Sequence, residues 1–266
     1  MAKIDPTARV ADGAKLGADV FIGPYCIIGN DVSLGDGCHL MAHVSIQGIT
    51  EIGAGAKIQP FASLGSPPQS THYKGEASRL IVGKNCDIRE GVTMNTGTAG
   101  GRMETRVGDN CMFMTGAHVG HDSIVGNNVI FANCATLGGH VDVGDFTFIG
   151  GFGAIIQFGK VGEQAMIGGC AAIRRDVIPF GLTGVDGTLD GLNLIGLKRR
   201  GFTRTDVQIL REAYRELFFG AGLFTDRVEK VAAAYPKHAA VQKVIAFIRA
   251  AGKRGVSTPS SHQEDE

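Results

Sequence analysis

Apolar residues recur at every sixth position through most of the first two thirds of the chain. The series runs from Ile4 to Leu64, from Val82 to Met94 and from Val107 to Ile173. A period of six fits neither the period of about 3.6 residues in a helix nor the simple alternation of a strand. It predicts short strands joined by tight corners, with three hexads closing one coil and parallel coils stacked about 4.8 Å apart.

Small residues occupy two further positions of the hexad. Gly follows the apolar residue in many repeats, as at Gly17, Gly35, Gly126 and Gly144. We expect these glycines to supply corner dihedral angles that a side chain would resist. Four positions after the apolar residue, small or β-branched residues such as Ala56 predict a second inward-facing position.

The six cysteines are spread singly along the chain. The first four, Cys26, Cys38, Cys86 and Cys111, fall at the small inward-facing position and are predicted to fill the core as thiols. No two cysteines have the C-x-x-C spacing, so the pattern does not support a zinc ribbon or a redox dithiol.

Two segments interrupt the repeat, and later the spacing becomes helical. Residues 65–80 and 99–106 predict loops that leave the scaffold, where ligands are commonly held. Thr203 and Asp206 have the spacing of a capping box at the start of a helix. We expect Thr225 to cap a second helix, and an apolar stripe at 241–248 predicts a third.

The predicted fold class is therefore mainly β, with a smaller helical part. We expect a parallel β-helix over residues 1–190, a helical domain over 191–256, and a disordered polar tail over 257–266. With 40 glycines and 7% aromatic residues among 266, the core must be built from aliphatic and small side chains.

Charge and hydropathy exclude several classes of protein. The 26 basic and 26 acidic residues cancel, which argues against a general nucleic-acid binder. No apolar run approaches the roughly 20 residues of a membrane span, and the N-terminus has no apolar signal stretch. We expect a cytoplasmic protein without a membrane span.

Stacking of the coils brings histidines together. Residues 18 apart share a column, so Gly139 lies over His121 and Gln157 over Gly139, while His118 and His140 lie close by. Three uses of such a cluster remain open. A neutral His121 could act as a general base beside an oxyanion-binding amide at Gly139. The three imidazoles could instead hold zinc, as in the γ-class carbonic anhydrases, or they could be structural surface residues.

Four segments carry a family resemblance, namely 117–122 (AHVGHD), 137–141 (LGGHV), 157–158 (QF) and 191–202 (GLNLIGLKRRGF). They resemble the acyl-[acyl carrier protein]–UDP-N-acetylglucosamine O-acyltransferases. The resemblance implies a left-handed β-helix, a homotrimer and no cofactor or metal. It also implies transfer of a 3-hydroxyacyl chain from acyl carrier protein to the 3-position of UDP-N-acetylglucosamine, the first step of lipid A biosynthesis.

The same resemblance implies roles for individual residues. His121 becomes the catalytic base, Asp122 its polarising partner and Gly139 the oxyanion donor. Since adjacent strand residues face opposite ways, a contact between His121 and Asp122 requires a corner. The implied substrate contacts are Gln69, His72, His118, His140, Gln157, Asn193, Arg199 and Arg200. Met166 and Gly169 match positions that limit the acyl-chain length.

The donor protein is acidic, which calls for a basic docking surface. Candidates in the helical region are Arg199, Arg200, Arg204, Arg211 and Arg215.

The chain also departs from the family pattern at four positions. Asn95, His72, Ile156 and Ile195 stand where many members carry His, Lys, His and Glu. Because these positions are expected to line the sugar and the nucleotide, the 3-amino analogue of the sugar nucleotide is an alternative acceptor. It would give an amide in place of an ester.

Overall fold

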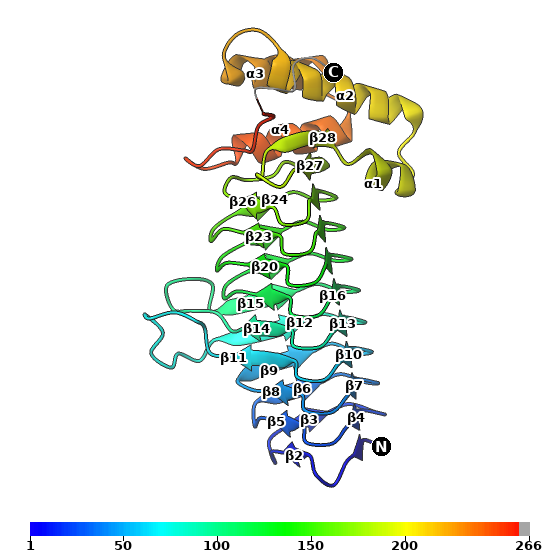
Figure 1. The fold of residues 1–266 in the computed structure, drawn as a ribbon, viewed down its shortest axis with the longest axis vertical. Coiled ribbons are helices and arrows are strands. Elements are labelled where there is room, and N and C mark those ends of the chain that lie inside the picture. The colour runs from blue at the N-terminus through cyan, green and yellow to red at the C-terminus, as the bar shows by residue number, and fades with distance from the viewer. Residues whose placement is uncertain (261–266) are drawn as a thin grey trace.

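The computed structural model describes residues 1–260. Most of the chain forms one long column of short strands, with helices only at its C-terminal end (Figure 1). Three sheets, here called A, B and C, make the sides of the column. Every strand pair is parallel except β27 with β28. From Ile4 to Ile173 the coils repeat every 18 residues outside the loops, whereas the last step is shorter, since Met166 pairs with Leu182. The hexad prediction is confirmed.

The strands of sheet A are β1 (Lys3–Ile4), β4 (Phe21–Ile22), β7 (His39–Leu40), β10 (Lys57–Ile58), β13 (Asp87–Ile88), β16 (Met112–Phe113), β19 (Ile130–Phe131), β22 (Phe148–Ile149), β25 (Met166–Ile167), β27 (Gly181–Thr183) and β28 (Leu189–Leu192). Those of sheet B are β2 (Arg9–Val10), β5 (Ile27–Ile28), β8 (Ser45–Ile46), β11 (Ser63–Ser66), β14 (Thr93–Asn95), β17 (His118–Val119), β20 (Thr136–Leu137), β23 (Ala154–Ile155) and β26 (Ala172–Ile173). Those of sheet C are β3 (Lys15–Leu16), β6 (Val32–Leu34), β9 (Ile49–Ile52), β12 (Arg79–Val82), β15 (Glu104–Val107), β18 (Ile124–Val125), β21 (Asp142–Val143) and β24 (Lys160–Val161).

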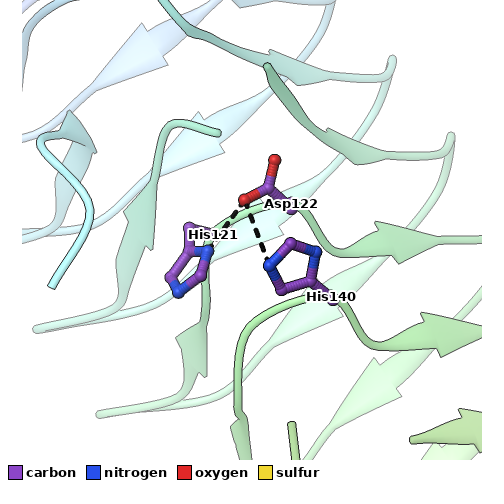
Figure 2. A group of neighbouring side chains, drawn as sticks. All are labelled: His121, Asp122 and His140. Carbon is purple, nitrogen blue, oxygen red and sulfur yellow. Dashed lines mark hydrogen bonds and ion pairs between the residues drawn. The ribbon is translucent and has the colours of Figure 1, made fainter. Parts of the chain in front are cut away.

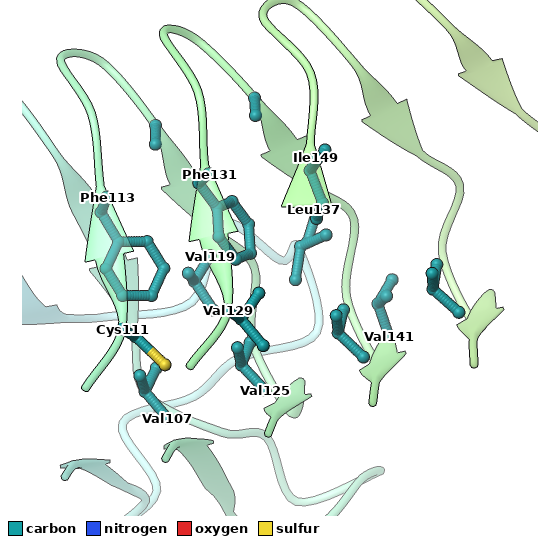
Figure 3. Packing of buried hydrophobic residues seen from close by; sticks show 14 of the residues in the cluster. Val107, Cys111, Phe113, Val119, Val125, Val129, Phe131, Leu137, Val141 and Ile149 are labelled. Carbon is teal, nitrogen blue, oxygen red and sulfur yellow. The ribbon is translucent and has the colours of Figure 1, made fainter. Parts of the chain in front are cut away.

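The recurring apolar residues point into the column and stack on their counterparts in the next coil (Figure 3). Phe113 and Phe131 are fully buried, with ring centroids 4.7 Å apart. Full burial of one such side chain contributes about 1.5–3 kcal/mol. The predicted cysteine positions are confirmed as well, since the first four thiols are buried and all six cysteines are free.

The glycines that follow the apolar residues have a different purpose from the one we expected. Gly17, Gly35 and Gly144 do not adopt a left-handed conformation. A Cβ atom at Gly144 would instead lie 2.4 Å from the backbone nitrogen of Glu163 in the next coil. These glycines are therefore required by close stacking between coils, and the prediction about corner dihedral angles is wrong.

The left-handed residues lie later in each corner and mostly carry side chains. Asp122, His140 and Phe158 occupy equivalent corners between sheets B and C, with φ of 60°, 59° and 64°. Left-handed backbone is uncommon for residues other than Gly, Asn and Asp, and it turns the side chain away from the direction it would have in a strand.

Both predicted loops are present, with shifted boundaries. Residues 67–78 connect β11 to β12, and residues 96–103 connect β14 to β15. They project from the same side of the column (Figure 1). A buried hydrogen bond of 2.9 Å from Ser78 Oγ to Thr96 Oγ1 links them.

Four helices follow the β-helix, namely α1 (Leu194–Arg199), α2 (Arg204–Phe219), α3 (Phe224–Ala234) and α4 (Ala239–Arg249). Thr203 and Asp206 form the predicted capping box of α2. The prediction for Thr225 is wrong, because α3 begins earlier, after Leu223, and has no side-chain cap. No helix among residues 1–260 is both long and apolar enough to cross a membrane.

The domain boundaries also differ from those predicted. The expected boundary between 190 and 191 falls within β28, so the helical part begins at Leu194. The expected tail begins too early, because Ser257 is buried and its amide donates to Asp176 O at 2.8 Å, while Thr258 O accepts from Leu189 N. The remainder of that predicted tail, residues 261–266, lies outside the described part of the chain.

Candidate functional site

His121 and Asp122 meet at the corner between β17 and β18 (Figure 2). His121 Nδ1 lies 2.8 Å from Asp122 Oδ2, and the side chain of Asp122 has no exposed surface. The left-handed backbone at Asp122 provides the corner that this contact between sequence neighbours requires. The carboxylate fixes the ring, so Nε2 is the nitrogen left to accept a proton.

Residues of the 96–103 loop surround the Asp122 carboxylate. The backbone amide of Thr98 and its hydroxyl both donate to it, the hydroxyl at 2.6 Å to Oδ2. The backbone amide of Arg102 donates to Oδ1 at 2.7 Å. Thr105, on β15, accepts a hydrogen bond from the backbone amide of Asp122. None of these residues could be predicted from the sequence, because the loop has no periodicity to indicate its direction.

The hydrogen bonds determine the charge state of Asp122. Burial alone would raise the pKa of its carboxyl group. The donors from Thr98, His121 and Arg102 outweigh burial and hold that pKa below its ordinary value. Asp122 is therefore an ionised carboxylate facing the imidazole at neutral pH.

Gly139 lies directly against the His121 ring. A Cβ atom at this position would be 2.5 Å from His121 Cε1 and 2.6 Å from Nε2, so any side chain here would displace the His121 ring. Within residues 1–260, no hydrogen bond uses the Gly139 amide. At another corner of the column the corresponding amide is occupied, since Asn127 Oδ1 accepts from Asp109 N at 2.8 Å. A free donor thus lies beside Nε2 of His121, the arrangement that an oxyanion site would require.

His140 completes the cluster one coil further along. Its Nε2 lies 3.7 Å from Asp122 Oδ2, and its ring meets the ring of His121 edge to face at 5.1 Å. Phe158 stacks on its other side at 4.5 Å. Burial lowers the pKa of His140 despite the nearby carboxylate, so the ring is neutral at physiological pH.

His118 lies on β17 and contacts a different partner. Its Nδ1 is 2.7 Å from the Thr93 hydroxyl. Burial, with a smaller contribution from His121, lowers the pKa of His118. A neutral imidazole held by a hydroxyl is suited to orienting a polar substrate rather than to carrying charge.

Metal-ligand atoms converge at the same place. His121, Asp122 and His140 offer one atom each within 4.8 Å of one another, and His118 is not part of this group. The three-imidazole set of the zinc hypothesis is therefore not the set that converges here. The carboxylate in the converging group is already surrounded by protein donors.

In the described part of the chain, no hydrogen bond or ring contact joins the predicted substrate contacts Gln69, His72 and Gln157 to His121. Gln69 and His72 are exposed on the 67–78 loop. Gln157 follows Gly139 in the predicted column, and its backbone carbonyl accepts a hydrogen bond from Arg254 at 3.0 Å.

Asn193, Arg199 and Arg200 are not brought to His121 within one chain. Asn193 caps α1, with its Oδ1 accepting from Gly196 N and its Nδ2 donating to Gln164 O. Arg200 donates to the carbonyl of Phe146 at 2.9 Å, at the corner between β21 and β22. His121 occupies a different corner of the column.

The two residues implied in chain-length control are both exposed, one on sheet A and one at the corner that follows it. Met166 is partly exposed on β25. A Cβ atom at Gly169 would meet only Gly151 O, at an ordinary 3.6 Å, so a side chain could be added there without displacing the backbone.

The family departures fall into two groups. Asn95 is buried, and its Nδ2 donates to Pro67 O at 3.0 Å at the base of the first loop. Ile156 and Ile195 expose 46% and 67% of their surface, so they present apolar groups where the family pattern has polar ones.

The chain is similar along nearly its whole length to a family of known acyltransferases. Residues 13–48 and 104–139 match the family model for the bacterial transferase hexapeptide repeat. Residues 176–257 match the family described as UDP N-acetylglucosamine O-acyltransferase, domain 2. The acyl-[acyl-carrier-protein]–UDP-N-acetylglucosamine O-acyltransferase of Azorhizobium caulinodans is 59% identical, covering 98% of this chain and 96% of the relative.

Solved structures resemble the fold along nearly the whole chain. The UDP-N-acetylglucosamine acyltransferase of Campylobacter jejuni is 38% identical with a TM-score of 0.90, covering 97% of this chain and all of that one. The enzyme of the same name from Francisella novicida is 31% identical with a TM-score of 0.93, covering 98% and 95%. This likeness confirms the predicted left-handed parallel β-helix with C-terminal helices.

Proposed function

This chain belongs to the acyl-[acyl-carrier-protein]–UDP-N-acetylglucosamine O-acyltransferases, and on that premise we propose that His121 is its general base. The enzyme transfers an acyl chain from acyl carrier protein to UDP-N-acetylglucosamine, the first step of lipid A biosynthesis. The names of the relatives specify O-acyl transfer, so a hydroxyl acceptor is favoured over the 3-amino analogue. They equally favour acyl transfer over a carbonic anhydrase activity.

The proposed reaction uses the two nitrogens of His121 differently. Nε2 removes the proton of the sugar 3-hydroxyl as its oxygen attacks the thioester carbonyl of the 3-hydroxyacyl carrier. Asp122 holds Nδ1 and stabilises the imidazolium that forms. The tetrahedral oxyanion receives a hydrogen bond from the Gly139 amide. When the intermediate collapses, the carbon–sulfur bond breaks and the carrier thiolate recovers the proton from Nε2.

One observation supports this assignment most directly. The His121 ring is tied through Nδ1 to a buried carboxylate at 2.8 Å, while its Nε2 side faces a glycine with a free amide. His118 and His140 are neutral and line the space nearby, where we propose that they orient the sugar and the acyl group.

The test is His121→Ala, assayed by mass spectrometry of the product from 3-hydroxyacyl carrier protein and UDP-N-acetylglucosamine. Loss of the base should reduce kcat by about 10²-fold or more. His39→Ala, at an exposed position on β7 and outside the candidate site, is the control for general damage. Turnover of His121→Ala at the parent rate would refute the proposal. Supplying the 3-amino sugar nucleotide in parallel tests the acceptor.

We further propose a homotrimer in which each site is completed by a neighbour. Support comes from Arg200, which lies at a different corner from His121 in one chain, as well as from Asn193 and Arg199 beside it. In a trimer these residues could reach the nucleotide bound at the neighbour's His121. Analytical ultracentrifugation, together with recovery of activity on mixing His121→Ala and Arg200→Ala subunits, tests this arrangement.

Acyl carrier protein is proposed to dock on the helical region. Arg211 and Arg215 are exposed on α2 and line a cleft against β28 with Leu194. Charge reversal at both arginines should raise KM for the carrier without changing KM for the sugar nucleotide. We also place the enzyme in the cytoplasm, in keeping with its buried free thiols.

A further inference from the structure

Arg102 links the corner at Asp122 to Asp142 in the next coil. Its backbone amide and its guanidinium both bond to Asp122, and the guanidinium also pairs with Asp142. Its amide donates to Asp122 Oδ1 at 2.7 Å, and its Nη1 donates to the Asp122 backbone carbonyl at 2.6 Å. The same guanidinium pairs with both carboxylate oxygens of Asp142, at 2.9 and 3.1 Å. Asp142 lies on β21, so the loop is anchored to a rigid strand of the β-helix.

The loop that Arg102 anchors also closes the site. Gly101 packs so closely that a Cβ atom there would be 2.4 Å from Asp122 Cγ and 2.5 Å from His140 Cε1. Thr98, from the same loop, supplies the hydroxyl donor to Asp122 Oδ2. The Asp122 carboxylate is fully buried, and residues of this loop provide most of its hydrogen-bond donors. Opening the loop would therefore expose the carboxylate to water and free it to rotate.

We propose that Arg102 is a positioning residue for the acyl transfer, acting through the Arg102–Asp142 ion pair that holds the 96–103 loop closed over Asp122. The inference rests on the proposed role of His121, because Asp122 matters to the reaction only through that ring. Among the described residues, the hydrogen bonds and ion pairs of Arg102 all go to Asp122 and Asp142, so its proposed effect on His121 is indirect.

The energetics separate this role from a merely structural one. The side chains of Arg102 and Asp142 are 38% and 37% exposed. Ion pairs at such positions add little to global stability, because water and salt screen them. Placement of a catalytic dyad, in contrast, is sensitive to shifts of an ångström or less. Loss of the pair should therefore lower kcat far more than it lowers thermal stability.

The experiment compares Arg102→Met with Arg106→Met in the full-length enzyme. Arg106 is a suitable control because it also pairs with a carboxylate, Glu104 Oε1 at 2.7 Å, and its side chain does not bond to Asp122. Arg102→Met should lose about tenfold in kcat with both KM values unchanged, while Arg106→Met stays within about twofold. Arg102→Lys, which retains the charge, should recover part of the loss.

Two further readouts make the result decisive. The downfield proton NMR signal of the His121 Nδ1–H bond should weaken or shift in Arg102→Met and remain in Arg106→Met. The double variant Arg102→Met/Asp142→Asn should be no slower than Arg102→Met alone, because both changes break one pair.

The proposal is overturned if Arg102→Met and Arg106→Met behave alike, or if the loss appears only as a lower melting temperature. His121→Ala is assayed alongside. If that variant stays active, the proposed general base fails, whatever Arg102 does. If it is inactive and Arg102→Met is unaffected, only the positioning role fails.

Discussion

His121 and Asp122 are adjacent in sequence, yet the Nδ1 of one lies 2.8 Å from the Oδ2 of the other. In a strand their side chains would point to opposite faces. The left-handed backbone of Asp122, with φ of 60°, turns its side chain back toward the ring. Asp tolerates this conformation better than most residues, so one amino acid serves both the corner and the dyad.

Replacement of Asp122 by Asn should reduce kcat by about 10²-fold or more, because a neutral amide cannot stabilise the imidazolium formed on His121. KM for the sugar nucleotide should change little, since Asp122 is fully buried and has no exposed surface to offer a substrate. Steady-state kinetics check this expectation, with circular dichroism to confirm folding. A loss of less than threefold would contradict the assigned role.

Gly101→Ala and Gly100→Ala form a matched pair in the second loop. A methyl group at Gly101 would clash with Asp122 Cγ at 2.4 Å and with His140 Cε1 at 2.5 Å. A methyl group at Gly100 would have no atom within 4 Å. Gly101→Ala should therefore lower kcat between about 10- and 100-fold, and Gly100→Ala should leave it near the parent value. Equal activity of the two variants would show that the loop does not press on the site in solution.

His118 should make stability depend on pH. Burial lowers its folded-state pKa below the ordinary 6.5, so the unfolded chain binds more protons just below pH 6.5. This contribution to stability is complete above pH 6.5 and is lost as the pH falls toward the folded-state pKa. In urea unfolding at pH 7.5 and 5.5, His118→Gln should narrow the stability difference between the two pH values. His72→Gln, on the exposed loop, should not.

Gly169→Met should shift the enzyme toward shorter acyl chains. The added side chain fits the backbone at Gly169, which is exposed at the corner that follows β25. Competition between carriers of different acyl length, read by mass spectrometry, measures the shift. Gly169→Ala should show a smaller one. If selectivity stays unchanged in an active Gly169→Met enzyme, the chain-length role is wrong.

The β-helix could be predicted because its apolar residues recur every six positions. Every recurring apolar residue from Ile22 to Ile173 is buried in the structure, and the column of His121 and Gly139 follows from the repeat of 18. The capping box of α2 could be recognised for a similar reason, since its two residues are close in sequence.

The surroundings of Asp122 could not be predicted, because they depend on long-range contacts made by an aperiodic loop. Thr98 and Arg102 lie 24 and 20 positions away from Asp122. Nothing in their spacing indicates that the loop folds inward. The spacing also led to the wrong prediction for Gly144. A close approach between coils and a left-handed corner both favour Gly, so the sequence alone does not distinguish them.

The two loops leave the column and rejoin it in register, with β12 pairing to β9 on one side and β15 on the other. The length of each loop therefore does not affect how the coils on either side of it pair. Such insertions can be lengthened, shortened or exchanged while the coils keep their alignment. The architecture thus separates a periodic frame from variable loops, and the donors to the buried Asp122 carboxylate come mainly from one of these loops.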